Sequence, residues 1–327
     1  MTCSGKFLYR SLCLSGVITV AASGLAIPQA QAKPLPATVK KHAVLCTCGN
    51  LEFTSSNVVG NVSIADNGAF IGSTADGPGS ITGTVGFAAA NTGQYSPDGI
   101  AVAGGATFGN ADVQTDINSF NAESQALKGV SGAPLTLTGG GSVNASSGTP
   151  IGGGEVVFDA TIAPSFVAGT TFTINGDGTG NQTVAVNIGA IGTGSVEFDG
   201  SIALTGGLTS DQVLFNFDSG DYETNTGGDT LTIDNNPPSI LVASVAGSAS
   251  PGDPSTSGLY FNPNGDIDVV DSVINGRVLG GPTNFAITDS DIIAPTVPEP
   301  TSLAVLGAAL VAFGVIRRRR RSLSTPS

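Results

Sequence analysis

Two segments of this chain group the oxygen-bearing side chains that hard cations prefer. NGDGTGN, residues 175–181, contains Asp177, and NPNGDID, residues 262–268, contains Asp266 and Asp268. Carboxylate and amide oxygens of this kind bind calcium. The spacing matches neither an EF-hand loop nor a GGxGxD repeat, and Asn, Asp and Gly are also ordinary turn residues. The three aspartates are therefore calcium candidates, with turn formation as the alternative, and no other cofactor is indicated.

The sequence contains few residues that could serve in acid–base catalysis. The chain has one histidine, His42, in a segment expected to precede the fold, so a Ser-His-Asp or Cys-His arrangement lacks a base. Asp159 and Asp199 occupy the same position in two similar sequence segments, and if these segments formed successive coils the two aspartates would be stacked on each other. Arg277 is the one arginine between the two chain ends, where a polysaccharide lyase would need one. We expect no catalytic residues, with a polysaccharide-active enzyme as the least favoured alternative.

Cysteine gives little information about function. Cys46 and Cys48 are separated by one residue, and a disulfide at this spacing closes a strained ring. His42 with these cysteines is an incomplete ligand set for zinc. We expect a structural or incidental role, with metal binding or an intermolecular bridge as alternatives.

The charge balance excludes one class of partner. The chain has 12 basic and 25 acidic residues, and residues 33–295 contain five of the basic and 24 of the acidic ones, a net charge of −19. Such a surface repels phosphate backbones, so we expect no binding of nucleic acid.

Composition and pattern predict a mainly β fold. Glycine is abundant, with 47 residues, and short alternating runs such as residues 57–72 and 79–90 are separated by Gly, Asn and Asp. GEVVFDATIA, from Gly154, and GSVEFDGSIA, from Gly194, share six of ten positions at an offset of 40, and a looser copy begins at Gly265. Repeats of this kind favour a Gly-rich β-solenoid (β-helix). A β-sandwich is the alternative.

One helix is predicted within this β-rich region. Asp112 is expected to cap its start and Gly129 to end it. The helical period places five residues on one face, which should pack on the sheet: Val113, Ile117, Phe120, Ser124 and Leu127. We expect this helix to pack in the core without a chemical role.

The N-terminal segment has the pattern of a signal peptide, residues 1–32. Basic residues precede an apolar run, and Ala30 and Ala32 form the small-x-small pattern that signal peptidase recognises, with cleavage before Lys33. Residues 33–46 are expected to form an extended leader, and residues 47–296 an extracellular β-rich domain.

The C-terminal segment predicts a membrane anchor. Residues 303–316, from Leu303 to Ile316, form an apolar run of about 21 Å as a helix, which Thr301, Ser302 and arginine stems extend toward a spanning length. The basic cluster that follows should stay in the cytoplasm, as should residues 322–327. The cluster consists of Arg317, Arg318, Arg319, Arg320 and Arg321.

Residues 297–321 resemble a known sorting signal. Val297, Pro298, Glu299 and Pro300, followed by one apolar span and terminal arginines, are similar to the PEP-CTERM signal of exported bacterial proteins. The resemblance implies a partner exosortase, a membrane-embedded cysteine protease-transpeptidase, which recognises the motif. It also implies that the protein is anchored in the membrane at first and is then secreted or placed on the cell surface.

The body resembles another group of domains. The segment NGRVLGG, residues 275–281, is similar to choice-of-anchor A and collagen-binding-like domains, which are β-helices with a helix packed alongside. That resemblance implies a structural or adhesive role in the extracellular matrix, with polysaccharide or another copy as partner. A binding module for glycan or ice is the alternative. Regular Thr-x-Thr rows would favour ice, and TFTIN (171–175) and TLTID (230–234) are too few to predict it.

Overall fold

The computed structural model describes residues 41–65, 68–75, 77–90, 94–167, 169–189, 196–218, 231–234, 255–263, 265–270, 272–282 and 284–295. All of them belong to one compact unit, Gln31–Ser327. The signal peptide, its cleavage site and the sorting tail lie outside the described residues.

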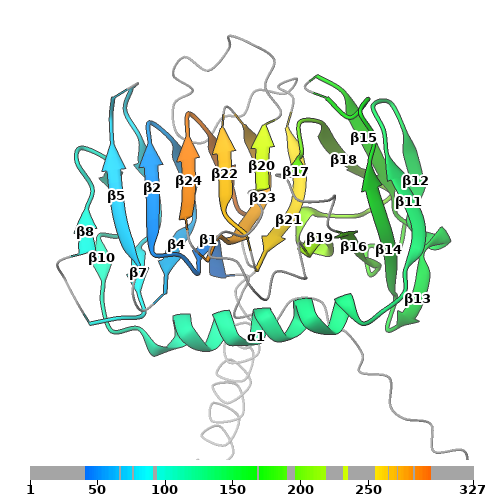
Figure 1. Ribbon diagram of the computed structural model, residues 1–327, viewed down its shortest axis with the longest axis horizontal. Coiled ribbons are helices and arrows are strands. Elements are labelled where there is room, and N and C mark those ends of the chain that lie inside the picture. The colour runs from blue at the N-terminus through cyan, green and yellow to red at the C-terminus, as the bar shows by residue number, and fades with distance from the viewer. Residues whose placement is uncertain are drawn as a thin grey trace, which may run out of the picture. The chain divides into compact units, whose positions relative to one another are not determined.

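The largest sheet is built from parallel strands that stack side by side. Its path is β10-β7-β4-β1-β23-β21-β19-β16-β14-β11. In that order the strands are Ala106–Thr107, Val85–Phe87, Asn61–Ile64, His42–Cys46, Val273–Gly280, Thr256–Asn262, Val213–Asp218, Thr183–Gly189, Glu155–Ile162 and Ala133–Leu137. We call this the helix-covered sheet, because helix α1 (Ala111–Lys128) lies along it (Figure 1).

A second parallel sheet, which we call the outer sheet, carries no helix. Its order is β17-β20-β22-β24-β2-β5-β8. These strands are Val196–Glu197, Leu231–Asp234, Ile267–Val270, Asn284–Thr288, Asn50–Thr54, Ala69–Ser73 and Tyr95–Ser96. In Figure 1 they run upward in front, with α1 below them.

Short strands complete the coils between these two sheets. One row begins at β23 and continues through β25 (Asp291–Ile293), β3 (Asn57–Val59), β6 (Ser80–Ile81) and β9 (Ala101–Val102). A separate sheet joins β12 (Ser142–Asn144), β15 (Thr171–Asn175) and β18 (Ser201–Thr205). β13 (Thr149–Gly152) pairs antiparallel with β14. Two 3-10 turns, η3 (Ala145–Ser147) and η4 (Ser210–Gln212), lie in connections.

The pairings confirm the predicted β-solenoid with one packed helix. Every pairing in the described part of the chain is parallel except that of β13 with β14. Parallel neighbours need a crossover connection, which each coil supplies. The alternative of a β-sandwich was wrong, since sandwiches are built from antiparallel sheets.

The coils do not stack in chain order. β1 pairs with β4 on one side and with β23, from the end of the chain, on the other. From β1 the chain coils outward to β10, crosses the sheet as α1, resumes at β11 and coils back to β23. Figure 1 shows the result as blue β2 beside orange β24. The first and last coils are therefore central neighbours.

The sequence echo at an offset of 40 is not the coil repeat. Glu155 pairs with Thr183, 28 residues later, whereas Asn50 pairs with Ala69, 19 residues later. The two echo segments also occupy different places, because the first forms β14 and the second spans β17 and β18. Asp159 and Asp199 are therefore not stacked in adjacent coils, as the repeat had suggested.

Inward-pointing side chains form one apolar interior. Alternation places Leu51 and Phe53 of β2 inside, next to Phe285 and Ile287 of β24, and all four are fully buried. Phe53 continues the stack onto Phe70 of β5, with ring centroids 5.8 Å apart. Each such side chain contributes about 1.5–3 kcal/mol by leaving water. The interior explains why strands this short stay paired.

Helix α1 confirms the predicted buried face. All five predicted residues are buried, and the four apolar ones form a second apolar cluster with residues of the helix-covered sheet such as Leu45 and Phe261. The predicted cap was wrong, because Asn110 is the N-cap and its Oδ1 accepts from the backbone N–H of Asp112. Gly129 ends the helix as expected. One buried polar residue on this face, Asp116, was not predicted.

The β-rich domain begins earlier than the sequence suggested. β1 starts at His42, inside the range assigned to the leader, and its five residues are buried. The conclusion that the histidine lies outside the fold was therefore wrong. In the ranges that the structure describes, α1 included, no helix is both long and apolar enough to span a membrane.

Candidate functional site

The outer sheet presents a regular seven-stranded parallel surface that carries no helix. We define its outer face by the side chains of β22, β24, β2 and β5 that point away from the interior. Neighbouring strands are about 4.7–4.9 Å apart, so these side chains form rows across the sheet. The first row consists of Asn284, Asn50 and Ala69. The second row consists of Asp268, Ala286, Glu52 and Ile71. The third row consists of Val270, Thr288, Thr54 and Ser73.

The central row of this outer face is acidic. Glu52 is exposed and Asp268 is half-buried, with the small Ala286 between them. The pKa of Asp268 is raised, first by partial burial and then by the negative charges of Asp266 and Glu52. Amide and hydroxyl groups flank the acids on both sides. The face can therefore donate and accept hydrogen bonds along an extended ligand, while it repels anions.

The calcium candidates are not brought together. Asp177 follows β15, where its Oδ1 accepts from the backbone N–H and the hydroxyl of Thr179, and these bonds lower its pKa. Asp266 precedes β22, and its Oδ1 accepts from the backbone N–H of Asn284. Asp177 thus organises a turn, whereas Asp266 bonds to the start of β24 in the neighbouring coil. No group of three or more His, Cys, Asp or Glu is placed to hold a metal within the described ranges.

The two Thr-x-Thr segments lie on different sheets. Thr171 and Thr173 belong to β15, whereas residues 231–234 form β20 of the outer sheet. They therefore do not add up to one array of threonines.

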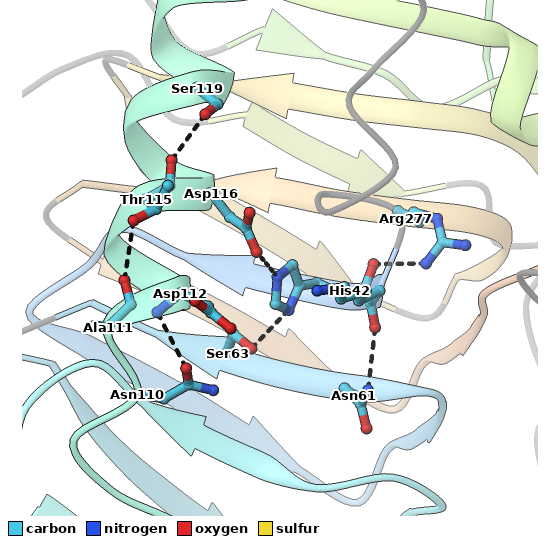
Figure 2. Close-up of polar contacts among 11 residues, drawn as sticks. His42, Asn61, Ser63, Asn110, Ala111, Asp112, Thr115, Asp116, Ser119 and Arg277 are labelled. Carbon is cyan, nitrogen blue, oxygen red and sulfur yellow. Dashed lines mark hydrogen bonds and ion pairs between the residues drawn. The ribbon is translucent and has the colours of Figure 1, made fainter. Parts of the chain in front are cut away.

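A buried polar cluster joins α1 to the helix-covered sheet (Figure 2). His42 of β1 lies 2.8 Å from Asp116 of α1 through Nε2, and 2.7 Å from the hydroxyl of Ser63 of β4 through Nδ1. Burial lowers the pKa of His42 more than Asp116 raises it, which favours a neutral ring. Nε2–H then donates to the carboxylate and the Ser63 hydroxyl donates to Nδ1.

These three residues have the types of a hydrolase triad, but their position does not suit catalysis. Ser63 is 3% exposed, His42 6% and Asp116 2%. A nucleophile must reach its substrate, and this hydroxyl lies beneath the helix. The cluster can instead fix the N-terminal half of α1 on the sheet.

A second polar cluster holds the other half of the helix. Ser124 donates to Oδ1 of Asn216 on β19 at 2.6 Å, and Asn216 donates to Asn187 on β16. Asn187 in turn donates to the backbone carbonyl of Leu127 and to Asp159. Asp159 also accepts from the backbone N–H of Gly132, so it has a structural role in this series of hydrogen bonds.

Arg277, at 1% exposure, is a buried structural cation. Its guanidinium donates to Oδ1 of Asp211 at 2.9 Å, to the carbonyl of His42 at 2.8 Å and to the carbonyl of Pro295 at 2.9 Å. It thus joins the first strand, η4 and the last described residue. The arginine of a lyase must reach its polysaccharide substrate, whereas this side chain is buried and its donors are bonded within the fold. Cys46, the last residue of β1, and Cys48, just after it, are disulfide-bonded to each other and buried.

Sequence reasoning missed the buried polar residues. A signal was present at Asp116, an acid on the apolar face of the predicted helix three residues after Val113. His42 and Ser63 carried no such signal, because their partners are distant in the chain.

Comparison with known protein families identifies a motif in the C-terminal segment. Residues 296–321 match the PEP-CTERM protein-sorting motif. This match confirms the predicted motif, which is the signal of exported proteins processed by exosortase and includes residues 297–300. The PEP-CTERM match begins one residue after Pro295, the last residue of the described fold.

Three solved structures are similar to the body at low sequence identity. A glycosylated ice-binding protein from Arctic yeast has a TM-score of 0.46 and 15% identity, covering 80% of this chain and 94% of that one. One from Antarctomyces psychrotrophicus has a TM-score of 0.45 and 11% identity, covering 81% and 100%. The DUF3494 domain of a Shewanella frigidimarina ice-binding protein has a TM-score of 0.40 and 12% identity, covering 80% and 96%. No curated protein matches by sequence.

These neighbours are ice-binding proteins by description, not choice-of-anchor A domains. The β-helix with a packed helix is shown by the strand pairings and by the buried face of α1. The resemblance to choice-of-anchor A domains is not confirmed.

Proposed function

We propose that this chain is an exported, non-enzymatic protein of the cell surface or extracellular matrix, which exosortase processes through Val297–Pro300. The PEP-CTERM match immediately after the folded body is the observation that carries this proposal. Signal peptidase would cut before Lys33, and residues 303–316 would hold the precursor in the membrane until exosortase acts.

We infer further that the outer face of the outer sheet binds a neutral extracellular polysaccharide. An extended polymer suits a repeating flat face, and the rows supply amide, hydroxyl and carboxylate groups to sugar hydroxyls. The net charge of −19 between residues 33 and 295 disfavours acidic polymers. Ice is the alternative ligand. The mixture of Glu52, Ile71 and Asp268 favours sugar over ice, since it breaks any uniform row of threonines.

The sorting proposal is tested by intact mass in a host that has an active exosortase. We expect the exported protein to lack residues 303–321. Replacing Glu299 and Pro300 together by alanine should leave the uncut precursor in the membrane, while Ser324→Ala, outside the motif, should be processed normally. A processed double variant would contradict the role of the motif.

The ligand proposal is tested on a panel of neutral glycans. Asn50→Ala with Thr54→Ala and Thr288→Ala should weaken binding at least about tenfold, because each hydrogen bond contributes about 0.5–1.5 kcal/mol. Gln125→Ala on the exposed side of α1 is the control. Thermal hysteresis without glycan binding would favour ice instead.

A further inference from the structure

Two glutamates influence each other electrostatically where α1 packs near the end of the helix-covered sheet. Glu155 begins β14 and is only 6% exposed. Glu123 lies in the second half of α1 and is half-buried. Oε2 of Glu155 and Oε1 of Glu123 are both inaccessible to water, and neither has a hydrogen-bond partner among the described residues.

Two buried carboxylates that are both negatively charged repel each other. The pKa of Glu155 is raised to about 7, by burial first and then by the charge of Glu123. No attractive charge acts on Glu155 within the described ranges. Arg277, the buried cation, is bonded to Asp211 elsewhere. Buried carboxylate oxygens without a partner are costly, so the pair requires a positively charged ligand or a proton.

We propose that Glu123 and Glu155 together bind a hard divalent cation, Mg²⁺ or Ca²⁺, that fastens α1 to β14. Two carboxylates supply a charge of −2 and the oxygen ligands that these ions prefer. One or two protein carboxylates with several retained waters form a common Mg²⁺ site. The two polar clusters fasten α1 through Asp116 and Ser124, and this cation would add a third attachment.

The site is separate from the predicted calcium candidates. Asp177 accepts bonds within its own turn and Asp266 accepts one from Asn284, and both lie in connections outside α1 and β14. The proposal also stands without the sorting function, since it depends only on residues within the fold.

The test is the melting temperature of the full chain at pH 8, after treatment with EDTA, in MgCl₂ or CaCl₂ against NaCl of equal ionic strength. A ligand at 100 times its Kd stabilises the native state enough to raise the Tm by about 5 °C or more. Glu155→Gln, of the same shape, should abolish this rise. Glu52→Gln, which removes an exposed acid of the same type, should keep it.

Each other outcome would overturn the proposal. A rise shared equally by wild type and Glu155→Gln would reflect general screening of the acidic surface. No rise with either metal, together with a pH dependence near 7 that Glu155→Gln removes, would assign the site to a shared proton instead.

Discussion

Replacing Arg277 by methionine tests how the two ends of the chain are joined. The substitution keeps an unbranched apolar stem but removes every donor of the guanidinium. It leaves the carbonyls of His42 and Pro295 and the carboxylate of Asp211 without their partner. The side chain is 1% exposed, so water does not easily replace it.

The expected cost follows from these contacts. Breaking a buried ion pair by removing one partner costs about 3–5 kcal/mol. Asp211 is 15% exposed and can regain some water, which places the estimate near the lower end, at about 3 kcal/mol. Domains of this kind have about 5–15 kcal/mol of total stability. The variant should therefore fold, with a clearly lower free energy of unfolding.

Urea unfolding of the full chain measures this loss. Asp211→Asn keeps an acceptor oxygen for Arg277 and leaves both carbonyl bonds intact, so it should cost only about 0.5–1.5 kcal/mol. If Arg277→Met costs less than 1 kcal/mol, the buried contacts do not stabilise the fold as argued. If Asp211→Asn costs as much as Arg277→Met, the ion pair and not the carbonyl bonds carries the effect.

Three further predictions concern other parts of the fold. Gly276→Ala should lower the Tm strongly, because a Cβ there meets the backbone carbonyl of Gly258, whereas Gly189→Ala meets open space and should be tolerated. Phe120→Ala should cost about 3–5 kcal/mol in urea unfolding and speed hydrogen exchange in α1, and unchanged exchange would contradict its anchoring role. Burial lowers the pKa of His42, so the unfolded chain binds more protons below about pH 6.5 and stability falls as pH falls. His42→Gln should flatten this slope between pH 7.5 and 5, and an unchanged slope would assign it to other groups.

Local signals made part of the fold predictable. The helical period of Val113, Ile117, Phe120 and Leu127 predicted the face of α1, because a helix beside a sheet must bury one stripe. Short alternating runs separated by glycine predicted the strands. The cap residue was off by two positions, since Asn110 and Asp112 are both good caps.

Long-range pairing made the rest unpredictable. Coils of 19 and 28 residues occur in one solenoid, so no fixed period exists to be detected. The pairing of β1 with β23 joins Val44 to Val278, and nothing local to either strand indicates it. The buried partners of His42 are likewise distant: Ser63 and Asp116 meet it only after the coils and the crossing helix are in place.

The central position of the last coil determines how the fold resists a pulling force. β24 lies between β22 and β2, and β25 lies between β23 and β3, so neither is an edge strand. A force applied through residue 296 therefore shears strands that are bonded on both sides, whereas a terminal coil would peel away one bond at a time. The described fold also ends at Pro295, next to the middle of the stack, so coils lie on both sides of the point from which residue 296 continues.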